Sequence, residues 1–144
     1  MKPPEQFRDL VDRPLFAAFA TARASGAPQA HVMWFMWDDA AERVRLTHTK
    51  TRQMYQFIQK EPRVALLVMD PDNGYRYMQI RGVVEGIEDD PEGKFYQQLM
   101  VRYRGSSSPV SDANVRVIMT IRPTVFVARQ AGSPPVVVGE EKKG

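Results

Sequence analysis

The segment DPDNG, from Asp70 to Gly74, constrains the fold of this chain more than any other feature of the sequence. Proline, glycine, asparagine and aspartate in succession favour a tight reversal of the backbone. Before this turn, Val64 to Met69 is a continuous apolar run, which predicts a buried strand. After it, polar and apolar residues alternate through a second strand, which can bend at Gly82. The sequence therefore predicts two neighbouring strands joined by a tight turn.

The rest of the chain adds further strands and three helices. We predict helices over Glu5–Asp12, over the segment that ends before Pro62 and over Asp89–Tyr103, and strands over Leu15–Thr21, Gln29–Trp37, Arg43–His48, Val115–Ile121 and Thr124–Arg129. A parallel α/β fold would need a helix after nearly every strand, and this chain does not supply them. Six to seven antiparallel strands with covering helices predict a mainly β (α+β) barrel. Residues 1–130 are expected to form this single domain, followed by a loosely ordered tail, 131–144.

Composition narrows the class of protein. The chain has 144 residues, enough for one domain with a real core, and no apolar run long enough to cross a membrane. It has no cysteine, which excludes disulfides and thiolate chemistry and suits a cytoplasmic protein. The net charge is +3, with basic residues spread in ones and twos. Small anionic ligands explain this balance as well as nucleic acid does, and nucleic acid stays the minor option because its binders usually show clustered cations.

The longest apolar segment is the strand Gln29–Trp37. Alternation would place Val32 and Trp34 on one face and Met33 and Phe35 on the other, so both faces are apolar. Such a strand is covered on both sides, by the core on one and by a ligand or a second subunit on the other. A central strand in a closed barrel is the equally simple alternative.

The segment Arg45–Arg63 offers an anion site. Thr47 and Thr49 precede a predicted helix, and Lys50 and Arg52 stand at its start. The first backbone N–H groups of a helix lack internal partners and the helix dipole is positive there, so cations and hydroxyls at this point suit a phosphate or carboxylate. The alternative is a threonine cap with two solvated charges.

Residues that would carry chemistry themselves are absent. The chain has no Gly-rich nucleotide motif, no metalloprotease helix and no nucleophile elbow. His31 and His48 lie on separate predicted strands, and the acidic run Asp89–Glu92 is explained as a helix cap. We therefore expect no metal site and assign no catalytic residue. If the chain is an enzyme, a cofactor supplies the reactive group.

Three blocks of the sequence together resemble a known superfamily. The first is GAP, at Gly26–Pro28, leading into the aromatic strand with Trp34. The second runs from Thr47 to Arg63, where RQ and EPR are similar to the pattern RQKYRNL…DPR. The third runs from Asp70 to Gly82 and is similar to DPDNPYRYVEVRG. Their order and spacing fit the flavin/deazaflavin oxidoreductase superfamily, which is pyridoxamine 5'-phosphate oxidase-like.

The resemblance implies a split β-barrel homodimer with cofactor sites at the subunit interface. Its phosphate would lie at the helix start and its ring along the aromatic strand, with the tyrosines and Gln79 reaching it from a neighbouring strand or the other subunit. The implied cofactor-binding residues are Val32, Met33, Trp34, Thr47, His48, Thr49, Lys50, Arg52, Gln53, Tyr75, Tyr77 and Gln79. The chain departs from the pattern at Met54 and Phe57, where the family has lysine and asparagine, leaving Lys50 as the replacement cation.

Among the branches of this superfamily, the short length and the DPDN…RY…RG block resemble most the one that uses the deazaflavin coenzyme F-420. The resemblance thus implies an F-420-dependent reductase that transfers a hydride to an unsaturated organic substrate. The alternatives are an FMN-dependent oxidoreductase, a binding protein that does not turn its flavin or deazaflavin over, and a structural or nucleic-acid-binding barrel.

Overall fold

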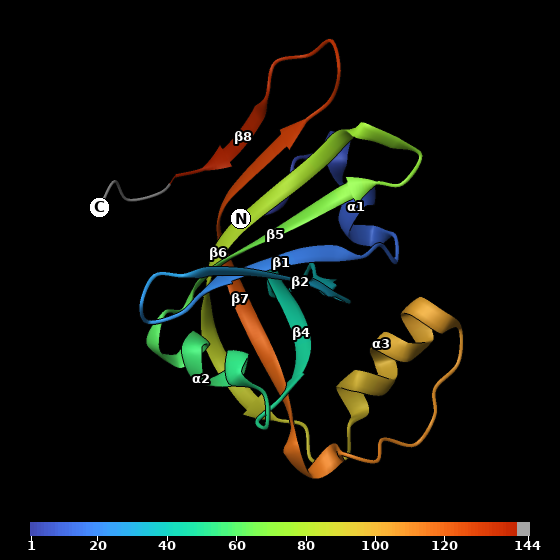
Figure 1. The fold of residues 1–144 in the computed structure, drawn as a ribbon. Helices are drawn as coiled ribbons and strands as arrows, with labels where there is room; N and C mark the ends of the chain where they lie inside the picture. The colour runs from blue at the N-terminus through green and yellow to red at the C-terminus, as the bar shows by residue number, and fades with distance from the viewer. Residues whose placement is uncertain (141–144) are drawn as a thin grey trace.

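The computed structural model describes residues 1–140, which form one antiparallel sheet with helices at its margins (Figure 1). The strands are β1 (Ala17–Ala22), β2 (Pro28–Met33), β3 (Met36–Asp38), β4 (Arg43–Thr49), β5 (Arg63–Asp70), β6 (Asn73–Asp89), β7 (Arg116–Arg129) and β8 (Val136–Gly139). The helices are α1 (Asp9–Asp12), α2 (Gln53–Lys60) and α3 (Lys94–Arg104), with short 3-10 turns at Glu5–Phe7 and Ala113–Val115. The strand order is β2-β1-β5-β6-β7-β4-β3, and β8 pairs with β7.

The two long strands β6 and β7 divide the sheet into two halves. The first half of β7 pairs with β4 and its second half pairs with β8, while β6 runs along both. The register shifts at Arg81/Gly82 and Val84/Gly86, so β6 bends there. A side chain at Gly82 would place its Cβ 2.5 Å from the carbonyl oxygen of Arg122, so only glycine fits. The predicted mainly β split barrel is confirmed, with eight strands in place of six or seven.

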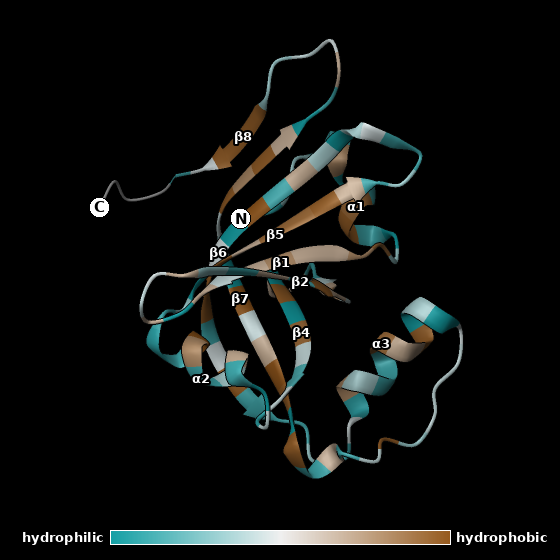
Figure 2. Cartoon of the chain, in the orientation of Figure 1, coloured by the Kyte–Doolittle hydropathy of each residue, from teal (hydrophilic) through white to brown (hydrophobic). Residues whose placement is uncertain are grey.

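One core lies inside the curled sheet. Phe19, Leu66, Ile80, Leu46 and Met119 come from five strands and are all fully buried. Figure 2 shows hydrophobic and hydrophilic residues alternating along β6, as expected where one face of a strand meets the core. Burial alternates along β4 as well, and its even-numbered residues are the ones that point toward the core. That pattern places His48 in line with the buried core positions, although it is polar.

The predicted strand Gln29–Trp37 is in fact two strands, with a break at Trp34 and Phe35. The Phe35 backbone N–H donates to the Tyr103 hydroxyl at 3.0 Å, and the Phe35 carbonyl accepts from Arg102 Nε at 3.1 Å. Both partners belong to α3 and lie 68 and 67 positions further along the chain. A local pattern carries no sign of such a partner, so the prediction of one continuous strand was wrong.

The C-terminal part of the chain is more regular than predicted. Val115–Ile121 and Thr124–Arg129, predicted as separate strands, form the single strand β7, because Pro123 lies opposite Gly82 beside a bulge, where its missing N–H is tolerated. The segment expected to be a loose tail contains β8, which pairs with β7 from Val125 to Ala128. Residues 141–144 lie outside the described part. Within residues 1–140, no helix is long and apolar enough to cross a bilayer.

Candidate functional site

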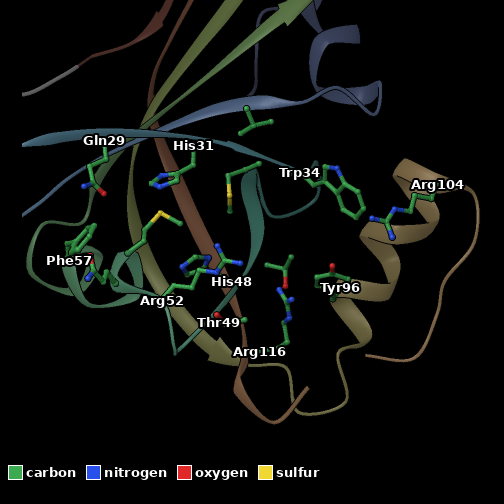
Figure 3. Close-up of a pocket in the computed structure, with 15 residues that line it drawn as sticks. Gln29, His31, Trp34, His48, Thr49, Arg52, Phe57, Tyr96, Arg104 and Arg116 are labelled. Carbon is green, nitrogen blue, oxygen red and sulfur yellow. The ribbon is translucent and has the colours of Figure 1, made fainter. Parts of the chain in front are cut away.

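A pocket of about 450 Å³ opens between β2, β4, α2 and α3. Figure 3 shows β2 along one side, α2 with Phe57 on the second, and α3 with Tyr96 and Arg104 on the third. The lining residues are Gln29, His31, Val32, Met33, Trp34, Thr47, His48, Thr49, Arg52, Gln53, Met54, Phe57, Tyr96, Arg104 and Arg116. The pocket therefore collects residues from four separate parts of the chain.

The sheet register explains how these parts meet. Thr49, the last residue of β4, pairs with Arg116, the first residue of β7. The chain then turns tightly, with the Arg52 N–H donating to the Thr49 carbonyl and the Thr49 and Thr51 hydroxyls 3.0 Å apart. Helix α2 starts immediately afterwards at Gln53. The end of β4 thereby brings hydroxyls, two guanidinium groups and a helix start to one side of the pocket.

That side of the pocket is prepared for an anion. Helix α2 has no side-chain cap, so its first N–H groups lack a side-chain acceptor. Within residues 1–140, the Arg52 side chain makes no hydrogen bond or ion pair and is exposed. Thr47 Oγ1 and His48 Nε2 are buried and have no hydrogen-bond partner among the described residues. Buried polar atoms almost always have partners, so these two indicate a ligand that supplies them.

His48 is neutral in this environment. Its side chain is only 6% exposed, and burial, followed by the nearby positive charges of Arg52 and Arg116, lowers its pKa from 6.5 to about 4. A neutral imidazole leaves Nε2 free to donate or accept a hydrogen bond to a ligand. The same positive charges that keep the proton off His48 attract an anion to the pocket.

The lowered pKa of His48 predicts a specific dependence of stability on pH. Because the folded-state pKa lies below the unfolded value, protonation favours the unfolded chain, and stability is lost as pH falls from about 6.5 towards 4. Between pH 7 and pH 5 this loss is about 2 kcal/mol. The His48→Gln variant lacks this titrating group. Between pH 7 and pH 5, its free energy of unfolding in urea titrations should therefore fall by about 2 kcal/mol less than that of the wild-type protein. Equal losses in both proteins would contradict the assignment.

The α3 side of the pocket is aromatic. The Trp34 ring stacks on Tyr103, with centroids 4.9 Å apart and planes 4° apart, and lies 6.5 Å from Tyr96. Arg104 lies over Trp34 with its guanidinium carbon 4.9 Å from the ring centroid. Arg116 lies 4.0 Å over Tyr96. The two walls thus differ: the α2 side offers hydroxyls and a helix start, and the α3 side offers flat rings with cations.

Eight of the twelve predicted site residues meet in this pocket: Val32, Met33, Trp34, Thr47, His48, Thr49, Arg52 and Gln53. Lys50 does not line it, because its ammonium group pairs with Asp89 at 2.6 Å. Nor do Tyr75, Tyr77 and Gln79 line it; they lie on β6.

Met54 and Phe57, the two residues that differ from the family pattern, lie in different surroundings. Met54 is 5% exposed and packs in the core as well as bordering the pocket. Phe57 lines the pocket and has the guanidinium carbon of Arg23 5.4 Å from its ring centroid. Neither can replace the missing lysine, and Lys50 is turned elsewhere. Arg116 lines the pocket as well, but its guanidinium is paired with Asp112, so Arg52 is the unpaired cation on this side.

Sequence reasoning missed several lining residues. Arg116 is placed only by the pairing of β4 with β7, and Tyr96 and Arg104 only by the position of α3. Gln29 and His31 follow from β2 once its side facing the pocket is known. No group of His, Asp or Glu side chains in the described residues is arranged to hold a metal ion.

Comparison with known proteins agrees with this geometry. A solved structure named F-420 reductase is 48% identical, with a TM-score of 0.81, and the match covers 85% of this chain and 97% of the other. A conserved hypothetical protein from Mycobacterium tuberculosis is 24% identical over 97% of this chain and 94% of its own, with a TM-score of 0.71. General stress protein 26 from Bacillus anthracis is 16% identical over 93% and 97%, with a TM-score of 0.67. The last two share the fold.

Among curated protein sequences, none matches the chain. The family model described as pyridoxamine 5'-phosphate oxidase matches residues 3–128, nearly the whole described chain. The chain therefore belongs to the pyridoxamine 5'-phosphate oxidase-like family of flavin and deazaflavin oxidoreductases.

Proposed function

We propose that this protein is a deazaflavin-dependent reductase that binds coenzyme F-420 in the pocket between β2, α2 and α3. The observation that carries the proposal is a set of polar groups at the α2 side of the pocket that lack partners among the described residues. Arg52 has no ion pair there, and Thr47 Oγ1 and His48 Nε2 have no hydrogen bond. Similarity to a protein named F-420 reductase supports the choice of cofactor. The cofactor tail carries a phosphate and carboxylates, which suits a mildly basic chain.

The residues present fit such a group. Arg52 and the free N–H groups of α2 would hold its phosphate, and Thr47, Thr49 and His48 would hydrogen-bond to it. Val32, Met33 and Trp34 would flank its planar ring. When bound in its reduced form, the deazaflavin would supply the hydride that reduces an unsaturated acceptor, and the balancing proton would come from solvent or from a tyrosine such as Tyr77. The protein contributes alignment of donor and acceptor and removal of water from between them.

FMN is the second candidate, because the family model carries the description pyridoxamine 5'-phosphate oxidase and the same phosphate site suits FMN. Parallel titrations of the purified protein with oxidised F-420 and FMN separate the two. Tight F-420 and weak FMN binding is the expected result, and the opposite preference would move the protein to the FMN branch. Binding of neither would overturn the proposal. Oxidation of reduced F-420 with a panel of acceptors distinguishes an enzyme from a binding protein, which gives no turnover.

We further propose that two copies associate through the outer face of the sheet. Val32 of β2 and Leu67 of β5 both pair with the same residue of β1, from its two sides. Leu67 in turn pairs with Gln79 of β6, and Met69 pairs with Tyr77. Directly paired residues share one face, so the tyrosine and glutamine that miss the pocket stand beside exposed apolar side chains. Val32, Leu67 and Met69 are 73%, 42% and 54% exposed. A second copy would cover this face and could deliver Tyr77 and Gln79 to its pocket.

Light scattering tests this association. The wild-type protein should have about twice the mass of the 16.4 kDa chain. Leu67→Glu buries a charge in the proposed interface and should give the monomer mass. Val101→Glu is the matched control, because Val101 is 51% exposed but lies on α3, away from this face. A wild-type monomer, or equal masses for the two variants, would contradict the proposal.

A further inference from the structure

Arg104 is a cation that the proposed cofactor site does not use. Its side chain is exposed, lines the pocket on the α3 side and, within the described residues, has no carboxylate partner. Its neighbour in the pocket, Arg116, is different: Nε and Nη2 donate to the two oxygens of Asp112 at 2.9 and 3.1 Å. The charge of Arg116 is therefore largely balanced, whereas that of Arg104 is open to a ligand.

The ring under Arg104 is held firmly. Trp34 stacks on Tyr103, and the Tyr103 hydroxyl donates to the Leu15 carbonyl at 2.7 Å. The same hydroxyl accepts from the Phe35 N–H at 3.0 Å, so the ring pair is fixed to the break between β2 and β3. A rigid aromatic wall loses little entropy when it binds a flat molecule.

We propose that this wall is the subsite for the substrate, and that the substrate is a planar conjugated molecule bearing a carboxylate or phosphate. The inference rests on the proposed function and names its substrate class. Tyr103 and the Arg104 guanidinium already stack on the Trp34 ring, so the conjugated part would lie beside Tyr96 and the edge of Trp34, and the acidic group would meet the guanidinium of Arg104. Aromatic walls favour flat π-systems, and an arginine fork favours planar anions.

The position of the wall separates it from the anion site of the cofactor. Figure 3 shows Arg52 beside α2 and Arg104 beside α3, with His48 and Arg116 between them. One cation thus stands on each side of the pocket. Arg52 would bind the cofactor phosphate. Arg104, the second cation without an ion pair among the described residues, would favour a substrate that carries an acidic group. A neutral acceptor would leave Arg104 without a counter-charge.

Calorimetric titration with a stable probe tests the subsite without requiring turnover. The probe is 2-naphthoate, and 2-naphthamide is its neutral match with the same ring. We expect wild-type protein, with and without bound F-420, to bind the acid about 10- to 100-fold more tightly than the amide. Arg104→Leu should remove most of this preference, and Arg104→Lys should restore part of it because it keeps the charge. The dissociation constant for F-420 should stay the same in Arg104→Leu.

Each other result decides against the subsite. If Arg104→Leu keeps the acid preference, or if Arg52→Ala abolishes it instead, the acid binds elsewhere. If Arg104→Leu weakens F-420 binding, Arg104 belongs to the cofactor site. Failure of the proposed function is separate, because it would appear as absent F-420 binding in wild-type protein while the probe titration without cofactor still reports on Arg104.

Discussion

Arg52→Ala should weaken binding of F-420 about 10- to 150-fold, which corresponds to the 1.5–3 kcal/mol expected for a hydrogen bond to a charged group. The effect is large because Arg52 is the cation at the start of α2, and no described side chain forms an ion pair with it. Fluorescence titration of the deazaflavin measures the change. Urea unfolding of the variant should match wild type, because an exposed side chain without a partner contributes little to stability.

Lys50→Ala is the matched control for this experiment. Lys50 lies two residues before Arg52 and carries the same charge, but its ammonium group pairs with Asp89 outside the pocket. Its removal should leave the dissociation constant within about twofold of wild type, since exposed ion pairs are worth little. Equal losses in the two variants would mean that general positive charge, and not the position of Arg52, attracts the cofactor.

Arg102→Leu should lower the free energy of unfolding by about 3–5 kcal/mol, the range for breaking a partly buried hydrogen-bond network. The Arg102 guanidinium donates to the carbonyls of Val11, Asp12, Arg13 and Phe35 at 2.8–3.1 Å. It thereby fastens α3 to the end of α1 and to the break after β2. Leucine keeps the apolar stem but removes all four of these bonds, and only the Arg13 and Phe35 carbonyls keep a second donor among the described residues, from the Leu15 N–H and the Tyr103 hydroxyl.

Arg104→Leu is the comparison, two residues further along α3. Arg104 makes a cation–π contact with Trp34 and no ion pair with a described residue, so its loss should cost less than about 1 kcal/mol in urea. If both leucine variants unfold at the same urea concentration, the carbonyl contacts of Arg102 do not hold α3 in place.

Much of the fold could be predicted because its signals are local. The turn at Asp70–Gly74, the alternation after Tyr75 and the glycine at 82 all describe their own surroundings, and the structure has a hairpin and a bulge there. The predictions failed where a distant partner decides the local structure. Phe35 leaves the strand because Tyr103 and Arg102 bond its backbone, and β8 forms because β7 offers a free edge.

The candidate site divides in the same way. The α2 side was predicted because strand, turn and helix start are consecutive in the sequence, from Thr47 to Gln53. The α3 side was missed because Tyr96, Arg104 and Arg116 reach the pocket only through the packing of α3 and the register of β7. Lys50 lies outside the pocket because its ammonium group pairs with Asp89, a partner that the sequence around Lys50 does not reveal.

The strand that borders the pocket stands at the margin of the sheet. Among the described strands, β2 is hydrogen-bonded to β1 alone, whereas β1 is also secured by β5. Its far end is pinned at Phe35 by α3, but its near end follows the exposed turn at Gly26. No residue of β2 is fully buried, and Met33 at its pinned end is the β2 side chain that packs against the main core. The β2 side of the pocket therefore depends on a single ladder, whereas the central strands β5, β6 and β7 are each paired on both sides.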